Sequence, residues 1–279
     1  MTPPPASATT SESDAQREWD AFVWSVEPGS YMQLSAWARV KAANGWSAWR
    51  PEVRGPDGRV GAQVLLRRPR PLPWAFAYAP RGPLADAWTV GTVDAFTDVL
   101  RVGPPRGMGR ISHIRVEPEI ERDGPLDPDG AIRRALGAAG WRPAPPVQPE
   151  ATRLIDLRAD EGALWADLRK KWRQYVNKAR ATGVTVREGE GDRLADFYRI
   201  YRETARRAGF LIRTEAAYRD IWEAFRPAGL ARLLLALAPD GEPQAALFLI
   251  RCGTRVVAPY GGMPAAGAES RAHYLLKWA

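Results

Sequence analysis

The sequence has one cysteine and two histidines among its 279 residues. A single cysteine cannot form an intrachain disulfide, and a zinc site needs several Cys and His ligands close together, so we expect neither a disulfide scaffold nor a metal site. Cys252 lies in the apolar run AALFLIRC. This setting favours a reduced, buried thiol in a cytosolic protein over a redox or nucleophilic cysteine.

Long apolar runs are missing too. No stretch approaches the roughly 18 to 20 apolar residues that cross a bilayer, and the first residues, MTPPPASATTSESDAQ, lack the basic and apolar regions of a secretory signal. We therefore expect a cytoplasmic protein.

Several common catalytic motifs are absent as well. The sequence contains no Walker phosphate loop and no GxSxG motif, and a Cys/His pair would require Cys252 to be exposed. Hydrolytic triads and metal catalysis are therefore disfavoured. The remaining classes are an enzyme that works by positioning and electrostatics, and a binding module.

Basic residues, by contrast, are abundant. The 40 Lys and Arg exceed the 32 Asp and Glu and give a formal net charge of +8. Such a surface attracts anionic partners such as nucleic acid, a nucleotide diphosphate or an acidic membrane face. A general preference of the host for arginine explains the same number equally well.

Proline and glycine clusters divide the chain. We expect a disordered tail over residues 1–16, a first domain over residues 17–148 and a second over residues 149–279, with the proline-rich WRPAPPVQPEA as the connector. The first domain is predicted to contain a helix in DAQREWDAFVWSV and another in SYMQLSAWARVKAANGW that Ser35 caps. These helices are followed by a hairpin at Asp57-Gly58, by the strands WAFAYAP and GRISHIRVEP, and by the helices TVGTVDAFTDVLRV and DGAIRRALGAAG.

The second domain is predicted to repeat this order of helices followed by antiparallel strands. It begins with a strand, TRLIDL, and one long helix, DEGALWADLRKKWRQYVNKARATG. The strand VTVRE, two helices and three strands follow. The final ESRAHYLLKWA starts an amphipathic helix that stops without a cap, so we expect a C-terminally truncated sequence.

Several blocks of the sequence, taken together and in order, carry a resemblance to a known family; they are SYMQLSAWARVKAANGW, AYAPRGPLAD, IRVEPEI, LRKKWRQYVNKARATGVTV, FYRIYRETARRAGFLIR, VVAPYGGM and AHYLLKWA. They resemble the FemABX family of aminoacyl-tRNA-dependent peptidoglycan-bridge transferases. The resemblance implies an α/β (α+β) fold of two tandem GNAT-like (acyl-CoA N-acyltransferase-like) domains, with mixed, mostly antiparallel sheets flanked by helices. The connection from Gly183 to Asp196 is too short for the family's long helical arm, which implies the FemX-like form.

The activity that the resemblance implies is the transfer of an amino acid from aminoacyl-tRNA to an amine of the peptidoglycan precursor stem peptide, in cell-wall biogenesis. An aminoacyl ester is already activated, so such an enzyme needs no nucleophile of its own. The partners implied are aminoacyl-tRNA and a UDP-linked or lipid-linked precursor, with no cofactor and no DNA. We expect a monomer with at most peripheral contact with a membrane.

The resemblance also implies site residues. Lys41 matches the lysine that contacts the precursor's diphosphate, and Arg206 is the better match to the second diphosphate ligand, with Arg207 and Arg213 as close alternatives. Tyr260, in ProTyrGlyGly, matches a substrate-contacting tyrosine, and we place it with Glu117 as catalytic. The family usually has an aspartate at Glu117, and water, phosphate groups or the tRNA could equally accept the proton of the attacking amine.

A basic helix forms the candidate tRNA contact. Lys170, Lys171 and Arg173 lie on it, interleaved with aromatic residues. Trp165, Leu168, Trp172 and Tyr175 recur at helical spacing, so we expect the aromatic residues to pack in the core and the basic face to contact RNA.

Two alternatives remain. An acetyl-CoA-dependent GNAT N-acyltransferase would have the same fold, but its pyrophosphate loop, Q/R-x-x-G-x-G/A, is not present. A non-catalytic protein that binds tRNA or the precursor is the other alternative, supported by Glu117, which departs from the family pattern, and by the incomplete C-terminus. A truncated chain can also be inactive although its parent is an enzyme.

Overall fold

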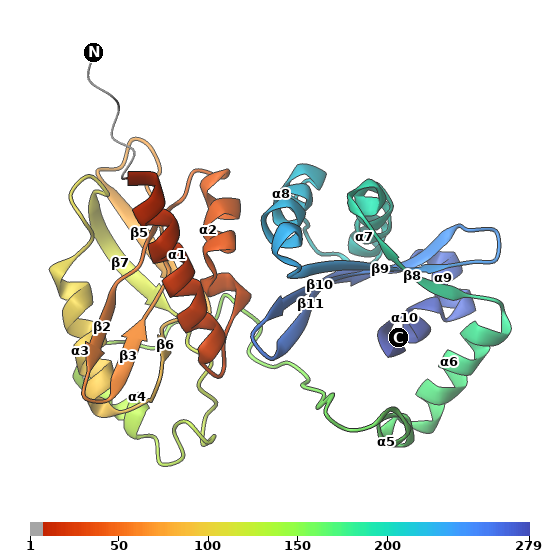
Figure 1. Cartoon of the computed structure of the whole chain (residues 1–279), viewed down its shortest axis with the longest axis horizontal. Helices are drawn as coiled ribbons and strands as arrows, with labels where there is room; N and C mark the ends of the chain where they lie inside the picture. Colours follow the sequence, from red (N-terminus) through yellow and green to blue (C-terminus); the bar gives the residue numbers. More distant parts are fainter. Residues whose placement is uncertain (1–7) are drawn as a thin grey trace. The chain divides into compact units, whose positions relative to one another are not determined.

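A computed structural model of the chain describes the backbone of residues 8–279 and the side chains of residues 13–279 (Figure 1). The chain divides into two compact units, residues 1–150 with 252–255, and residues 151–251 with 256–279. Both contain helices and sheets. None of the described helices is long and apolar enough to cross a membrane.

The first helix is longer than its apolar pattern predicts. Helix α1 (Ala8–Ser25) buries Trp19, Phe22 and Val23. The disordered tail expected over residues 1–16 is therefore wrong for residues 8–16, and residues 1–7 lie outside the described part. Once the buried residues have nucleated the helix, adding residues at its N-terminal end costs little.

Helix α2 (Ser35–Ala42) follows a short 3-10 helix, η1 (Tyr31–Gln33). Ser35 is its first residue and does not cap it, so that prediction is wrong. The carboxylate of Asp20 accepts hydrogen bonds from the backbone N–H of Ser35, at 2.7 Å, and from its hydroxyl. An acid of α1 therefore satisfies the free donors at the start of α2.

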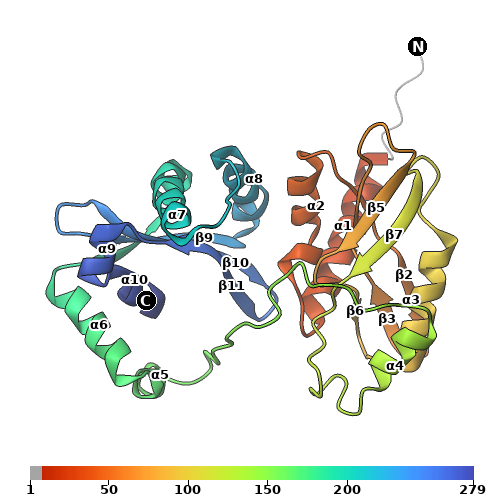
Figure 2. The ribbon, with the colours of Figure 1, turned by 180° about the vertical axis from the view of Figure 1, so that it is seen from behind.

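Two sheets form the middle of the first unit. One has the order β1-β4-β5-β7 and comprises β1 (Ser47–Trp49), β4 (Val64–Arg67), β5 (Trp74–Ala79) and β7 (Arg110–Val116). The other has the order β2-β3-β6 and comprises β2 (Glu52–Gly55), β3 (Gly58–Gly61) and β6 (Leu84–Ala85). Strands β5 and β7 pair in parallel, and Figure 2 shows them side by side. The expected hairpin at Asp57-Gly58 is confirmed, with Gly58 at φ +97°.

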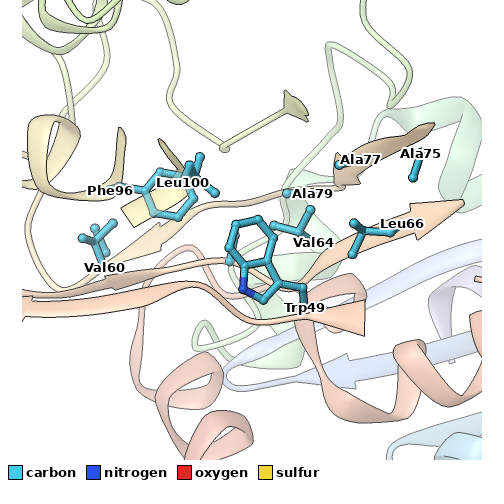
Figure 3. Close-up of a cluster of buried hydrophobic side chains, with 11 residues drawn as sticks. Trp49, Val60, Val64, Leu66, Ala75, Ala77, Ala79, Phe96 and Leu100 are labelled. Carbon is cyan, nitrogen blue, oxygen red and sulfur yellow. The ribbon is translucent and has the colours of Figure 1, made fainter. Parts of the chain in front are cut away.

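Helices α3 (Val90–Val102) and α4 (Ala131–Ala138) are confirmed where the sequence predicts them. Phe96 and Leu100 of α3 pack with apolar residues of the strands, among them Trp49, Val64 and Leu66, in the buried cluster of Figure 3. This shared core joins both sheets to α3.

Two glutamines are fully buried in the same unit. The side-chain amide of Gln33 donates to the carbonyl of Pro80 at 2.7 Å and accepts from the backbone N–H of Gln63 at 2.6 Å. The side chain of Gln63 donates to the carbonyl of Leu34 at 2.9 Å and accepts from Arg50. A buried amide is stable only when its donors and acceptors are paired, so these bonds fix three chain segments against each other.

The second unit has one four-stranded sheet with helices. Its helices are α5 (Glu161–Asp167), α6 (Lys170–Ala181), η2 (Gly191–Arg193), α7 (Leu194–Ala208), α8 (Glu215–Phe225), η3 (Arg226–Ala228), α9 (Ala265–Ser270) and α10 (Ala272–Trp278). The sheet order is β11-β10-β9-β8, from β8 (Thr185–Gly189), β9 (Ala231–Leu237), β10 (Pro243–Cys252) and β11 (Arg255–Gly262). Only η2 separates β8 from α7, so the long helical arm has no place there.

Two helices that the sequence predicts as continuous are broken. Leu168 is extended at φ −60°, ψ 135° and separates α5 from α6. Nη1 of Arg173 donates to the carbonyls of Ala166, at 2.7 Å, and of Leu168, at 2.6 Å, and so satisfies the end of α5. The second break, between α9 and α10, is at Arg271, which has φ +63°.

The predicted strand TRLIDL is also wrong. Residues 152–157 form no strand within the described part of the chain, and Leu154, Ile155 and Leu157 are 65%, 63% and 71% exposed. A strand requires a hydrogen-bonded partner, which the apolar pattern alone does not supply.

Replacing Gln33 by Leu should lower the free energy of unfolding by about 2–5 kcal/mol, because three buried backbone groups, the carbonyls of Gln63 and Pro80 and the N–H of Gln63, lose a partner. Urea unfolding followed by circular dichroism measures the change. Gln174→Leu, at an exposed position of α6, is the control and should stay within about 0.5 kcal/mol of the wild type. Equal stability of the two variants would contradict the role of the buried amides.

Arg173→Ala should destabilise the chain by about 1–2 kcal/mol, because the carbonyls at the end of α5 lose a charged donor. Lys170→Ala, one turn earlier and exposed, should have little effect. The same urea experiment compares them, and an Arg173→Ala midpoint no lower than that of Lys170→Ala would show that the guanidinium does not hold the break.

Candidate functional site

An aromatic cluster around Tyr260 forms the candidate site of the second unit. Tyr260 lies on β11, and its hydroxyl accepts a hydrogen bond from Nη1 of Arg213 at 3.2 Å. Its ring centroid lies 5.1 Å from that of Tyr218 and 6.1 Å from those of Tyr201 and Phe248. These residues come from α7, α8, β10 and β11, so four elements position one phenol and one guanidinium.

The glycines after Tyr260 serve internal packing. A Cβ atom on Gly262 would lie 2.3 Å from the Oγ1 of Thr204, and one on Gly261 would lie 3.0 Å from the carbonyl of Ala246. The absence of side chains at Gly261 and Gly262 therefore lets β11 pack closely against α7 and β10. This packing fixes the position of β11 and of Tyr260.

Burial keeps the neighbouring phenols protonated. It raises the pKa of Tyr218 to about 12 and, with the charge of Tyr260 as a smaller cause, raises the pKa of Tyr201. The hydroxyl of Tyr218 also accepts from the backbone N–H of Arg213 at 3.3 Å, which fixes the loop that carries the guanidinium. Sequence reasoning missed both tyrosines. The spacing of Phe197 and Tyr201, one helical turn apart and with stacked rings, was the available signal.

The three candidate arginines have different surroundings. Arg213 contacts Tyr260, as described. Arg207 donates to the carbonyl of Met263 at 2.8 Å and lies 3.7 Å from Glu203. Arg206, the better match by sequence, is exposed and has no ion pair or hydrogen bond with the described residues. The contacts therefore join Arg213, and neither of the others, to the tyrosine.

Lys41 lies on α2 in the first unit. Its ammonium is 5.0 Å from the ring centroid of Trp37 and 5.8 Å from that of Trp46. It is half-buried, so it differs from the solvated lysine typical of a helix surface.

Glu117 follows β7, and its carboxylate is already bonded within the first unit. One oxygen accepts from the hydroxyl of Tyr78, and the other accepts from the backbone N–H of Val147 at 2.5 Å. Gln148 donates to the Tyr78 hydroxyl at 2.9 Å. Burial, with the bond to Glu117, raises the pKa of Tyr78 well above its usual value. The carboxylate thus has a fixed orientation and ties the proline-rich connector to the sheet.

The basic residues of α6 do not share one environment. Lys170 and Lys171 are exposed, and the ammonium of Lys171 lies 5.7 Å from the ring of Tyr175. Arg173 instead caps α5. The aromatic residues are half-buried, so the core packing expected from the sequence is met only in part. The rings of Trp172 and Tyr175 lie 4.6 Å from that of Tyr274 on α10.

Cys252 is buried, and burial raises the pKa of its thiol to about 12. The neutral thiol is a poor nucleophile, which agrees with the structural role expected from its apolar neighbours.

Known proteins resemble the chain in sequence and in fold. A model of the FemAB family matches residues 14–106 and 139–242. The lipid II:glycine glycyltransferase of Staphylococcus aureus is 29% identical over 226 residues, which cover 78% of this chain and 53% of the relative. The chain thus spans about half the length of the curated relatives it matches.

A solved structure described as the crystal structure of FemX is 20% identical and has a TM-score of 0.79. The match covers 94% of this chain and 82% of that one. At this identity the likeness shows the fold, and it confirms the fold expected from the sequence.

Proposed function

The chain belongs to the FemAB family, whose model matches more than half of its residues, and from this we propose that it is an aminoacyltransferase. It moves an amino acid from aminoacyl-tRNA to an amine of the peptidoglycan precursor stem peptide. The name of the Staphylococcus aureus relatives favours a lipid-linked acceptor over a UDP-linked one. The observation that carries the proposal, besides the family, is the fixed Arg213–Tyr260 pair.

The proposed reaction needs no covalent enzyme intermediate. The amine nitrogen attacks the ester carbonyl carbon, a C–N bond forms, and the ester C–O bond breaks. The amine loses a proton and the departing ribose hydroxyl of the tRNA gains one. Because the ester is already activated, holding the two substrates together supplies much of the rate. The buried Cys252 thiol agrees with direct transfer.

Arg213 and Lys41 are the proposed diphosphate contacts. A guanidinium can engage phosphate oxygens in pairs, and Arg213 is held in place by Tyr260 and Tyr218. Arg206 and Arg207 remain candidates from the family match alone. Tyr260 is proposed to contact the substrate through its hydroxyl, next to the guanidinium.

Glu117 is the proposed acceptor of the amine proton. Its bonds to Tyr78 and Val147 orient the carboxylate, as a general base requires. Lys170 and Lys171 are proposed to contact tRNA, whereas the cap that Arg173 provides to α5 argues against its inclusion.

Arg213→Ala and Tyr260→Phe should each lower kcat/KM for transfer roughly 10- to 100-fold, because each removes a polar contact with the substrate. The assay incubates the chain with mixed charged tRNAs and a UDP-linked or lipid-linked muropeptide and measures the acceptor by mass spectrometry. Arg219→Ala, at an exposed position of α8 and 3.4 Å from Glu215, is the control and should stay within about twofold.

Three results of this assay would contradict the proposal. If Arg213→Ala and Tyr260→Phe are as active as the control, the substrate does not bind at Tyr260. Acetylation from acetyl-CoA without aminoacyl transfer would favour the N-acyltransferase alternative. Binding of tRNA or precursor without transfer would favour a non-catalytic protein.

Glu117→Gln should reduce transfer about 10²- to 10⁴-fold while the urea midpoint stays close to that of the wild type, because an amide oxygen can still accept from Val147 but cannot take a proton. Tyr78→Phe, which removes a bond to Glu117 but no base, is the companion variant and should retain most of the activity. If Glu117→Gln and Tyr78→Phe lose activity equally, the carboxylate is a positioning group.

A further inference from the structure

A group of arginines without ion pairs marks one edge of the first unit. Five exposed arginines lie on the end of β4, the loop to β5, the loop before β7 and the first residue of β7; they are Arg67, Arg68, Arg70, Arg106 and Arg110. None of them forms an ion pair with the described residues. Residues 67–74 and 103–110 contain no Asp or Glu. Other exposed or edge arginines of this unit do form ion pairs, as Arg54 does with Glu18 and Arg59 with Glu52.

The two segments lie side by side. Trp74 is the register partner of Arg110 where β5 and β7 begin. A Cβ atom on Gly109 would lie 3.9 Å from Nη1 of Arg68. The positive charge of both loops is therefore concentrated at one end of the sheet, with no acid in either segment to offset it.

Exposed apolar side chains lie among these arginines. Leu72 is 42% exposed and Trp74 is 47% exposed. Leu72 follows a turn in which its backbone N–H donates to the carbonyl of Pro69 at 2.9 Å. Three prolines between Arg68 and Trp74 restrict the loop, so its apolar residues stay exposed at little cost in entropy.

We propose that this surface, Arg67–Trp74 with Arg106 and Arg110, docks the chain on an anionic phospholipid bilayer. Arginines near such a surface are attracted to its lipid phosphates, and Trp and Leu side chains enter the boundary between headgroups and acyl chains. Stable attachment needs both a polybasic and an apolar contribution, and the loop carries both. Leu72 cannot stack on a base or donate a hydrogen bond, which favours a bilayer over RNA.

The inference rests on the proposed function in one respect: a lipid-linked acceptor lies at a membrane, where this surface would hold the enzyme. Docking would then raise the local concentration of the acceptor without contacting the reacting atoms. None of the arginines of this surface belongs to the proposed site.

Flotation of the full chain with vesicles tests the proposal. The vesicles are phosphatidylcholine alone or phosphatidylcholine with phosphatidylglycerol. The wild type should bind the anionic vesicles and not the neutral ones. Arg68→Gln/Arg70→Gln should weaken binding about 30-fold, from the loss of two arginine contacts, and Leu72→Ser about tenfold. Arg133→Gln/Arg134→Gln, an equal charge change at two exposed positions of α4 in the same unit, should have little effect.

Other outcomes overturn the proposal. A wild type that ignores anionic vesicles, or a loop variant that binds as well as the α4 control, would exclude membrane docking. A loop variant that loses tRNA binding while keeping vesicle binding would assign the surface to RNA. Transfer in the absence of vesicles, to a UDP-linked or a detergent-solubilised lipid-linked muropeptide, separates the two hypotheses. The loop variant should retain this transfer, whereas failure of the wild type with both acceptors would count against the proposed function alone.

Discussion

The first unit depends on the pairing of two amide side chains that no water reaches. Gln33 and Gln63 are both 0% exposed, and the hydrogen bonds of their side chains join residues at least 13 positions apart in the sequence. Because Gln33 holds Pro80, it also fixes the loop in which the carbonyl of Gly82 accepts from the backbone N–H of Glu117 at 2.9 Å. The orientation of this carboxylate thus follows from a buried hydrogen-bond network that an apolar core could not specify.

The second unit positions its polar groups with aromatic rings. Tyr218 contacts both the ring of Tyr260 and the backbone of Arg213, so the guanidinium and the phenol are placed by the same side chain. The family motif predicted Tyr260 and gave Arg213 as an alternative. It did not predict Tyr218, because a tyrosine at a helical position looks like an ordinary core residue until the fold brings three elements around it.

Local signals predicted most elements, and contacts between distant residues decided the rest. The Asp57-Gly58 turn is predicted correctly because its geometry depends on residues that are adjacent in the sequence. The free N–H groups at the start of α2 are bonded by Asp20 of α1. The free carbonyls at the end of α5 are bonded by Arg173 of α6. Helix periodicity predicts neither pairing. The strand expected over residues 152–157 fails for the same reason, since its apolar pattern does not identify a partner.

Direct transfer without an enzyme-bound intermediate is the central claim. The intact mass of the protein and the mass of the muropeptide, both measured after incubation with charged tRNA, test it most directly. We expect the muropeptide to gain one amino-acid residue while the protein mass stays unchanged, whether or not the acceptor is present. An aminoacyl adduct on the protein when the acceptor is omitted, or a muropeptide that gains no mass, would contradict the account.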